Sequence, residues 1–176
     1  MAHKRFDIQK EINIDAPAEK LWEMVGPGFV EVYQWSSNVD FAKGQGNSPF
    51  PGAVCDERFC ELNVNGFSNI SEKLTSYNEE KMSLGYVVNK GMPAFIHKAA
   101  NEWSVVPVGH HRSKLVMKAT FELTGIMGLL MKGIMQRKMG KTLETVLKDA
   151  KVYAETGQVS EAKRKRIREL EKKVAV

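Results

Sequence analysis

The sequence predicts an α+β fold in which one antiparallel sheet packs against one long C-terminal helix. Several segments show the two-residue alternation of half-buried strands, and short turn-forming stretches separate them, which is typical of an antiparallel sheet. Residues 125–154 instead have the periodicity of an amphipathic helix. A sheet with one apolar face and a helix with one apolar stripe are both buried when the two pack together.

The predicted helix carries its apolar stripe along its whole length. Side chains spaced by three and four residues share one helix face, and here they are Met127, Met131, Met135, Met139, Leu143, Val146, Ala150 and Tyr153. The first half also holds Gly128, Gly133 and Gly140, which weaken a helix, and all four of these methionines, which fit irregular or changing partners. The methionines could therefore roof a cavity that opens, or could simply fill a core.

The rest of the chain predicts a strand, two short helices and six further strands, in that order. The first strand covers residues 6–14, and Asp15-Ala16-Pro17 then ends it and begins a helix that reaches Val25. A second short helical piece is expected over 29–35. The six strands are expected at 39–41, 53–62, 67–76, 81–88, 95–106 and 112–123, with Asn65-Gly66 as a hairpin turn between two of them.

The charge of the chain is concentrated at its C-terminal end. The 176 residues carry a net charge of +5, of which residues 157–176, with seven Lys or Arg and three Glu, contribute +4. We therefore expect residues 1–156 to form one folded domain, and 157–176 to be a basic tail, helical or partly disordered. Because the body has no basic excess of its own, nucleic-acid binding is not expected.

Other classes of protein are disfavoured by what the sequence lacks. There is no run of about 18 apolar residues and no secretory signal, so we expect a cytoplasmic protein without a transmembrane segment. Two cysteines suit a reducing compartment, and the four histidines have no zinc-ligand spacing. No glycine-rich phosphate loop follows a strand. Neither a metal nor a cofactor is expected.

Glu72 is the most unusual of the candidate site residues. Strand alternation places it on the same face as Ile70 and Leu74, and a carboxylate on an apolar face is costly unless it is paired or protonated. In a pocket it could accept a hydrogen bond from a ligand hydroxyl or act as a general base. It could equally form a structural pair with Arg58, or face solvent if the register differs.

The other candidate ligand-binding residues come from the later strands. Tyr86 could hold a polar ligand atom while its ring lines an apolar wall, or could be a core residue. His97 and Asn101 would be polar points on a face shared with Trp103, as in small-molecule sites, although a lone histidine is more often structural. Met117 and Phe121 belong to an apolar strip that lines either core or cavity.

Taken in order, these stretches resemble the START-like, or SRPBCC, superfamily, and within it the polyketide cyclase/dehydrase and lipid transport family. The resemblance covers about residues 4–154 and rests on INIDAPAEKLWEMVG at 12–26, FVEVYQW at 29–35, PGAVCDERF at 51–59, ISEKL at 70–74, LGYVV at 84–88, MPAFIHKAANEWSVVP at 92–107 and LVMKATFEL at 115–123. It implies the helix-grip fold, a curved antiparallel sheet of six to seven strands wrapped around the long C-terminal helix. It also implies a ligand cavity between the two.

The function expected from the sequence is the binding or transport of a small hydrophobic molecule of lipid, polyketide or aromatic type. Two alternatives remain open, because the superfamily includes several activities on one fold. One is a cyclase- or dehydratase-like enzyme using Glu72 with Tyr86 or His97. The other is a protein-interaction module with a filled core.

Overall fold

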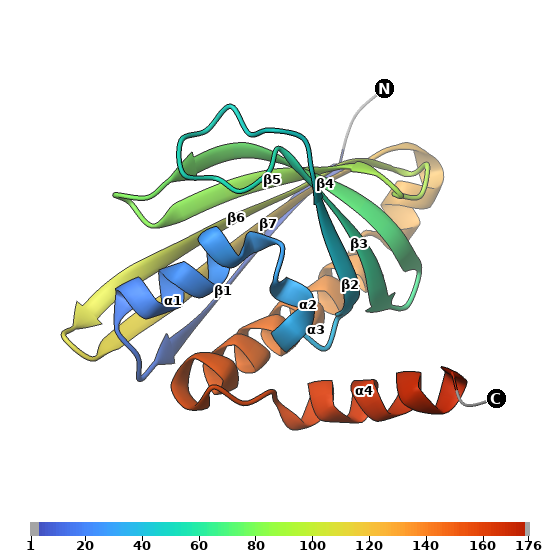
Figure 1. The fold of residues 1–176 in the computed structure, drawn as a ribbon. Coiled ribbons are helices and arrows are strands. Elements are labelled where there is room, and N and C mark those ends of the chain that lie inside the picture. Colours follow the sequence, from blue (N-terminus) through green and yellow to red (C-terminus); the bar gives the residue numbers. More distant parts are fainter. Residues whose placement is uncertain (1–3, 175–176) are drawn as a thin grey trace.

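The computed structural model describes residues 4–174 as seven strands and four α-helices (Figure 1). The strands are β1 (Lys4–Ile14), β2 (Val39–Gln45), β3 (Glu57–Val64), β4 (Phe67–Asn78), β5 (Ser83–Lys90), β6 (Ile96–Gly109) and β7 (Arg112–Leu123). The helices are α1 (Ala18–Val25), α2 (Val32–Trp35), α3 (Gly125–Thr156) and α4 (Glu161–Val174), with a 3₁₀ turn at Pro27–Phe29.

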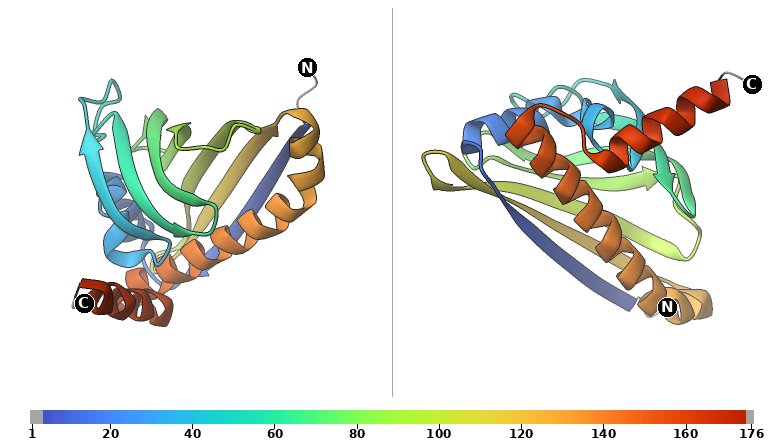
Figure 2. Two further views of the ribbon diagram at one scale, coloured as in Figure 1. Left: turned by 90° about the vertical axis from the view of Figure 1, so that its right-hand side faces the viewer. Right: turned by 90° about the horizontal axis from the view of Figure 1, so that it is seen from below.

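The strands form one antiparallel sheet that curves around α3. Its order is β1-β7-β6-β5-β4-β3-β2, so every neighbour except β1 and β7 is also a neighbour in sequence. Figure 2 shows α3 lying along the hollow side of the sheet, with the short helices α1 and α2 closing one end. The predicted α+β fold, with two short helices after the first strand, is confirmed.

Strand alternation decides which side chains of β7 face α3. Buried residues alternate with half-buried ones along the whole strand, and those facing inward are Ser113, Leu115, Met117, Ala119, Phe121 and Leu123. The neighbouring strand β1 is in register with them, pairing Phe6 with Phe121, whose rings stack with 5.1 Å between centroids. The core therefore lies between the inner face of the sheet and α3.

Two predicted strands differ from the observed ones. In β6 the register with β7 shifts between Ile96 and Lys98, so Ile96 faces inward and His97 is exposed. This bulge overturns the expected face of His97, since one extra residue reverses the alternation. The strand expected from residue 53 begins only at Glu57; Cys55 therefore precedes it, and both cysteines are buried and unpaired.

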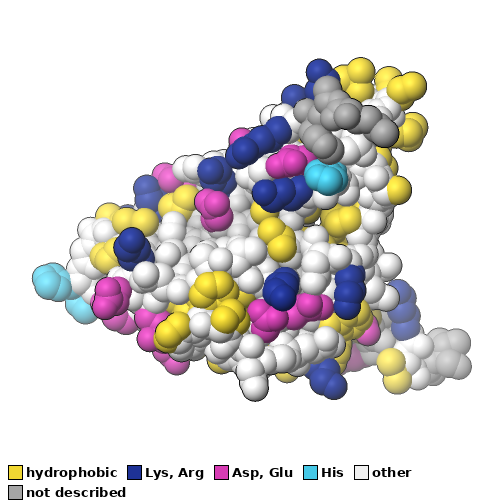
Figure 3. All heavy atoms as spheres, turned by 90° about the horizontal axis from the view of Figure 1, so that it is seen from above, with side chains coloured by type: hydrophobic (Ala, Val, Ile, Leu, Met, Phe, Trp, Pro, Cys, Tyr) yellow, Lys and Arg dark blue, Asp and Glu magenta, His cyan; other side chains and the backbone are white. Residues whose placement is uncertain are grey.

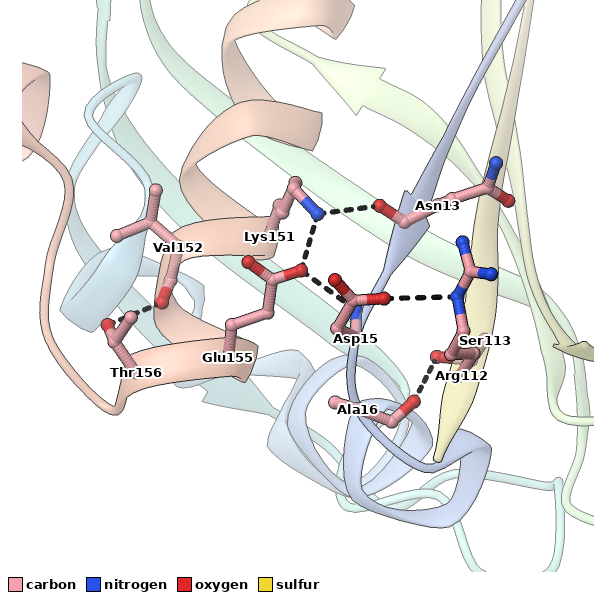
Figure 4. A network of polar contacts seen from close by, with 9 residues as sticks. All are labelled: Asn13, Asp15, Ala16, Arg112, Ser113, Lys151, Val152, Glu155 and Thr156. Carbon is pink, nitrogen blue, oxygen red and sulfur yellow. Dashed lines mark hydrogen bonds and ion pairs between the residues drawn. The ribbon is translucent and has the colours of Figure 1, made fainter. Parts of the chain in front are cut away.

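The C-terminal end of α3 is tied to the end of β1, and through Asp15 to β7, by the polar contacts drawn in Figure 4. Lys151 Nζ donates to the carbonyl of Asn13 at 2.9 Å, and Glu155 accepts a hydrogen bond from the backbone N–H of Asp15 at 2.8 Å. Arg112 in turn pairs with Asp15 at 3.0 Å. Gly157, in the left-handed region at φ 70°, ends the helix with its N–H bonded to Tyr153 O.

The basic tail forms α4, which contacts the body through polar groups. Ser160 caps its first turn by accepting from the N–H of Lys163 at 3.1 Å. Lys163 is buried, and its ammonium donates to the carbonyl of Val39 at 2.8 Å. Arg166 pairs with Asp40, which also lies on β2. None of the helices in residues 4–174 has the length and apolar character needed to cross a bilayer.

Candidate functional site

A cavity of about 140 Å³ lies between the inner face of the sheet and the middle of α3. Its wall is mostly apolar and comes from β3 to β7, from the α2–β2 region and from α3; among the lining side chains are Val39, Leu62, Phe67, Ile70, Met92, Ala99, Met117, Ala119, Phe121, Met139 and Leu143. An apolar cavity of roughly 150 Å³ stays dry and holds a benzene-sized ligand. The cavity as it stands therefore suits one aromatic ring or a short chain.

Arg58 and Glu72 form a buried ion pair in the cavity wall. They lie opposite each other on β3 and β4, and Arg58 Nε donates to Glu72 Oε2 at 2.8 Å while Nη2 reaches the same oxygen at 2.5 Å. Both side chains are less than a tenth exposed. A buried pair of this kind survives only when its remaining hydrogen-bonding groups are satisfied.

The surroundings of Arg58 meet that requirement. Its third donor, Nη1, bonds to the carbonyl of Phe29, and its guanidinium lies 3.8 Å from the centroid of the Phe29 ring. The centroid of the Tyr86 ring lies 5.6 Å from the same guanidinium. Burial is the largest single effect and acts to lower the pKa of Arg58, but attraction to Glu72, Cys60 and Tyr86 and the hydrogen bonding to Glu72 together raise it, so the charge is retained.

Three further side chains place polar atoms at this wall. Burial raises the pKa of Cys60, whose thiol is 3.5 Å from Glu72 Oε2, to about 12. Burial, reinforced by Glu72, also raises the pKa of Tyr86 well above its ordinary value, so the hydroxyl stays protonated. The nearby indole N–H of Trp103 acts to lower the pKa of Tyr86. It nevertheless forms no hydrogen bond of normal geometry within residues 4–174. It is a buried donor that a ligand could use.

The structure brings seven of the eleven candidate residues together around the cavity: Glu72, Tyr86, Asn101, Trp103, Met117, Phe121 and Met139. His97 lies outside because of the bulge in β6. The other three are methionines of α3 that do not line the cavity. Met127 is 56% exposed, Met131 is half-buried, and Met135 is buried without lining the cavity.

The helix geometry explains why the methionine stripe divides. Each step of four residues turns about 40° past a full circle, so Met127 and Met139 differ by about 120° around the axis. Spacing by four alone therefore does not keep side chains on one face over three steps. Met139 faces the cavity, whereas Met127 faces solvent, which corrects the expectation that all four methionines form one roof.

Arg58 and Cys60 are site residues that the sequence interpretation did not place in the cavity. Arg58 was considered only as a structural partner of Glu72, and the observed pair confirms that partnership. Strand alternation could have placed both residues at the cavity. One face of β3 carries Arg58, Cys60, Leu62 and Val64, and all four line the cavity. Within residues 4–174 no cluster of three His, Cys, Asp or Glu side chains could hold a metal ion.

Residues 5–155 match the family described as polyketide cyclase/dehydrase and lipid transport. No curated protein matches the chain. Among solved structures, a START superfamily protein from Mycobacterium smegmatis is similar with a TM-score of 0.69 and 16% identity, over 87% of this chain and 97% of that one.

Two enzymes share the fold at similarly low identity. Truncated norcoclaurine synthase from Thalictrum flavum has a TM-score of 0.68 and 14% identity, over 86% of this chain and 94% of that one. The Zhui aromatase/cyclase from Streptomyces sp. R1128 has a TM-score of 0.65 and 12% identity, over 89% of this chain and all of that one. At such identities the likeness establishes the fold alone.

Proposed function

The chain belongs to the polyketide cyclase/dehydrase and lipid transport family, and we propose that it binds a small hydrophobic ligand between the sheet and α3 and releases it unchanged. The observation that carries this proposal is an apolar cavity of about 140 Å³ with one buried ion pair in its wall. Apolar walls supply affinity, and a few fixed polar groups supply orientation. The ligand is therefore an aromatic or short aliphatic molecule with one oxygen-bearing end.

Binding is favoured over catalysis by the state of the polar groups at the wall. General acid–base catalysis at neutral pH is most efficient when the pKa of the group lies near 7. The pKa of Cys60 is about 12 and that of Tyr86 is also far above neutrality, while Glu72 is engaged by two nitrogens of Arg58. His97, the other group considered as an acid or base, is not at the cavity. These groups are suited to hold an oxygen rather than to move a proton.

The cavity itself is tested by a matched pair of substitutions, Ala119→Leu and Ala150→Leu. Both alanines are buried, but only Ala119 lines the cavity, while Ala150 lies on α3 away from it. Ala119→Leu should fill the cavity with little change in the free energy of unfolding, and should weaken toluene binding by about tenfold or more. Ala150→Leu should cost about 1–3 kcal/mol of stability through overpacking.

Urea unfolding measures the free energy of unfolding of each variant. Titration with toluene, monitored by NMR, measures the affinity of the cavity. If Ala119→Leu is as destabilising as Ala150→Leu and the wild type binds no toluene, the core is filled. The ligand-binding proposal then fails, and the interaction module takes its place.

The polar end of the cavity is tested by comparing p-cresol with toluene, which differ by one hydroxyl. Glu72→Gln alone would leave the charge of Arg58 buried and unpaired, at a cost of about 3–5 kcal/mol. The double variant Arg58→Met with Glu72→Leu removes both charges and should be close to the wild type in stability. It should weaken p-cresol binding by about fivefold or more, as expected for a lost hydrogen bond of about 1 kcal/mol, and leave toluene binding unchanged. Equal effects on both ligands would exclude the ion pair as the oxygen-binding group.

A further inference from the structure

The first turns of α3 expose an apolar surface that the fold does not use. Five large hydrophobic side chains there are between 56% and 79% exposed: Ile126, Met127, Leu129, Leu130 and Ile134. Figure 3 shows hydrophobic side chains gathered at one corner of the molecule, with Lys and Arg side chains beside them. Scattered exposed hydrophobics are common, but a cluster of five on three helical turns indicates a binding surface.

The outward face of α3 changes from apolar to cationic along its length. Ile126, Leu130 and Ile134 follow one another at a spacing of four residues, and the exposed Arg137 and Lys141 continue the same face. The rise from Ile126 to Ile134 is about 12 Å, and Arg137 lies about 4.5 Å further along the axis. Apolar groups therefore occupy one end of the helix, and cations occupy the next turns.

The charged side chains that α3 places around this surface are all cationic. Residues 124–143 contain four Lys or Arg and no Asp or Glu. On β1, the exposed Lys4 is paired with Leu123, so another cation stands beside the start of the helix. A protein partner or a second copy of the chain would have to cover these cations with acidic groups of its own. A bilayer with anionic headgroups presents such groups above an apolar layer.

From this arrangement we propose that the first turns of α3, residues 126–134, insert into the surface of an anionic lipid bilayer. Interfacial helices sink about 5–10 Å into the boundary between headgroups and acyl chains. If the N-terminal end of α3 enters first, Ile126, Leu130 and Ile134 reach the apolar layer, while Arg137 and Lys141, further along the axis, lie among the phosphates. The surface is separate from the cavity wall, since none of the five apolar residues lines the cavity.

Co-sedimentation of the full chain with vesicles tests the proposal. Vesicles of phosphatidylcholine with phosphatidylglycerol are compared with vesicles of phosphatidylcholine alone. The wild type should bind the anionic vesicles, and a triple variant (Ile126→Ser, Leu130→Ser, Ile134→Ser) should bind them at least about tenfold more weakly. Arg137→Gln with Lys141→Gln should weaken binding by about fivefold for each charge removed.

Two control variants make the test specific. Val54→Ser with Val108→Ser removes apolar groups of similar exposure elsewhere on the surface, and Lys165→Gln with Lys172→Gln removes two exposed cations from α4. Both should bind the anionic vesicles as the wild type does, and all variants should keep the wild-type circular dichroism. The proposal is overturned if the wild type does not sediment with anionic vesicles, or if the triple variant binds them equally well. It is also overturned if sedimentation equilibrium reveals a dimer that the triple variant converts to monomer, because the surface then joins two copies of the chain.

Discussion

The two halves of α3 have the same secondary structure but different relations to the rest of the protein. In the second half, residues 139–156, Asp149 is 1% exposed and its carboxylate accepts hydrogen bonds from the backbone and hydroxyl of Ser37, each at 2.7 Å, and from the hydroxyl of Ser160. Lys151 and Glu155 add the contacts to β1 seen in Figure 4. This half is fixed by the body of the protein.

The first half of α3, residues 125–138, buries fewer side chains and forms fewer hydrogen bonds with the rest of the protein. It buries Gly128 and Met135, and Lys138 Nζ donates to the carbonyl of Asn65, at the tip of the β3–β4 hairpin, at 2.6 Å. The cavity-lining residues Val64 and Phe67 flank that tip, and Met139 follows Lys138 directly. The four α3 residues that line the cavity all belong to the second half, so the exposed half borders the cavity without forming its wall.

The largest effect should come from removing the anchor of the fixed half. Asp149→Ala leaves one buried N–H and two buried hydroxyls without their acceptor, so we expect it to cost about 3–5 kcal/mol in the free energy of unfolding, or about 10 °C in Tm. Lys148→Ala, at the exposed neighbouring position, should change stability by no more than about 0.5 kcal/mol. Urea and thermal unfolding measure both. A cost below about 1 kcal/mol for Asp149→Ala would mean that the anchor is unimportant.

Deletion of residues 157–176 should have the next largest effect. The low apolar content of this segment alone would predict almost no loss of stability, but Ser160, Lys163 and Arg166 all bond to the body. Their loss should cost about 2–3 kcal/mol, or about 5–10 °C in Tm. Deletion of 171–176 alone keeps these contacts and is the control. If both deletions leave Tm unchanged, the contacts of α4 contribute nothing.

The smallest effects should come from two glycines within the exposed half. A Cβ at Gly133 would meet no atom within 4 Å, so Gly133→Ala should stabilise the protein by about 0.8–1 kcal/mol through helix propensity. A Cβ at Gly128 would lie 2.9 Å from Leu123 Cβ, so Gly128→Ala should destabilise it by about 1 kcal/mol or more. Urea unfolding of both variants shows whether each substitution raises or lowers the free energy of unfolding. Stabilisation by both substitutions would show that even Gly128 is not held against the sheet.

Much of the fold could be predicted from the sequence because its signals are local. The alternation in 112–123 and the helical period of 125–154 depend on neighbouring residues only, and both elements are observed there. Six candidate residues on strands reached the cavity wall because the alternation places them on the inner face, and Met139 reached it through the helical period of α3. His97 did not, because the bulge at 96–98 is set by pairing with Glu122 and Leu123 at the far end of β7, which no local pattern indicates.

The contacts of α4 and the exposure of Met127 escaped the sequence for different reasons. Lys163 is buried because it meets a carbonyl of β2, a partner 124 residues away that no local pattern indicates. Met127 could have been placed more accurately from the rotation of about 40° in each four-residue step, which moves the stripe around the helix.

Native-state hydrogen exchange along α3 tests the difference between its halves most directly. Amides open locally with free energies that depend on how much of the structure holds them. We predict that the backbone amides of residues 143–156 exchange only through near-global unfolding, and that those of 128–136 exchange at least about tenfold faster through local opening. Equal protection along the whole helix would contradict this difference, because α3 would then be one rigid element held equally by the body at both ends.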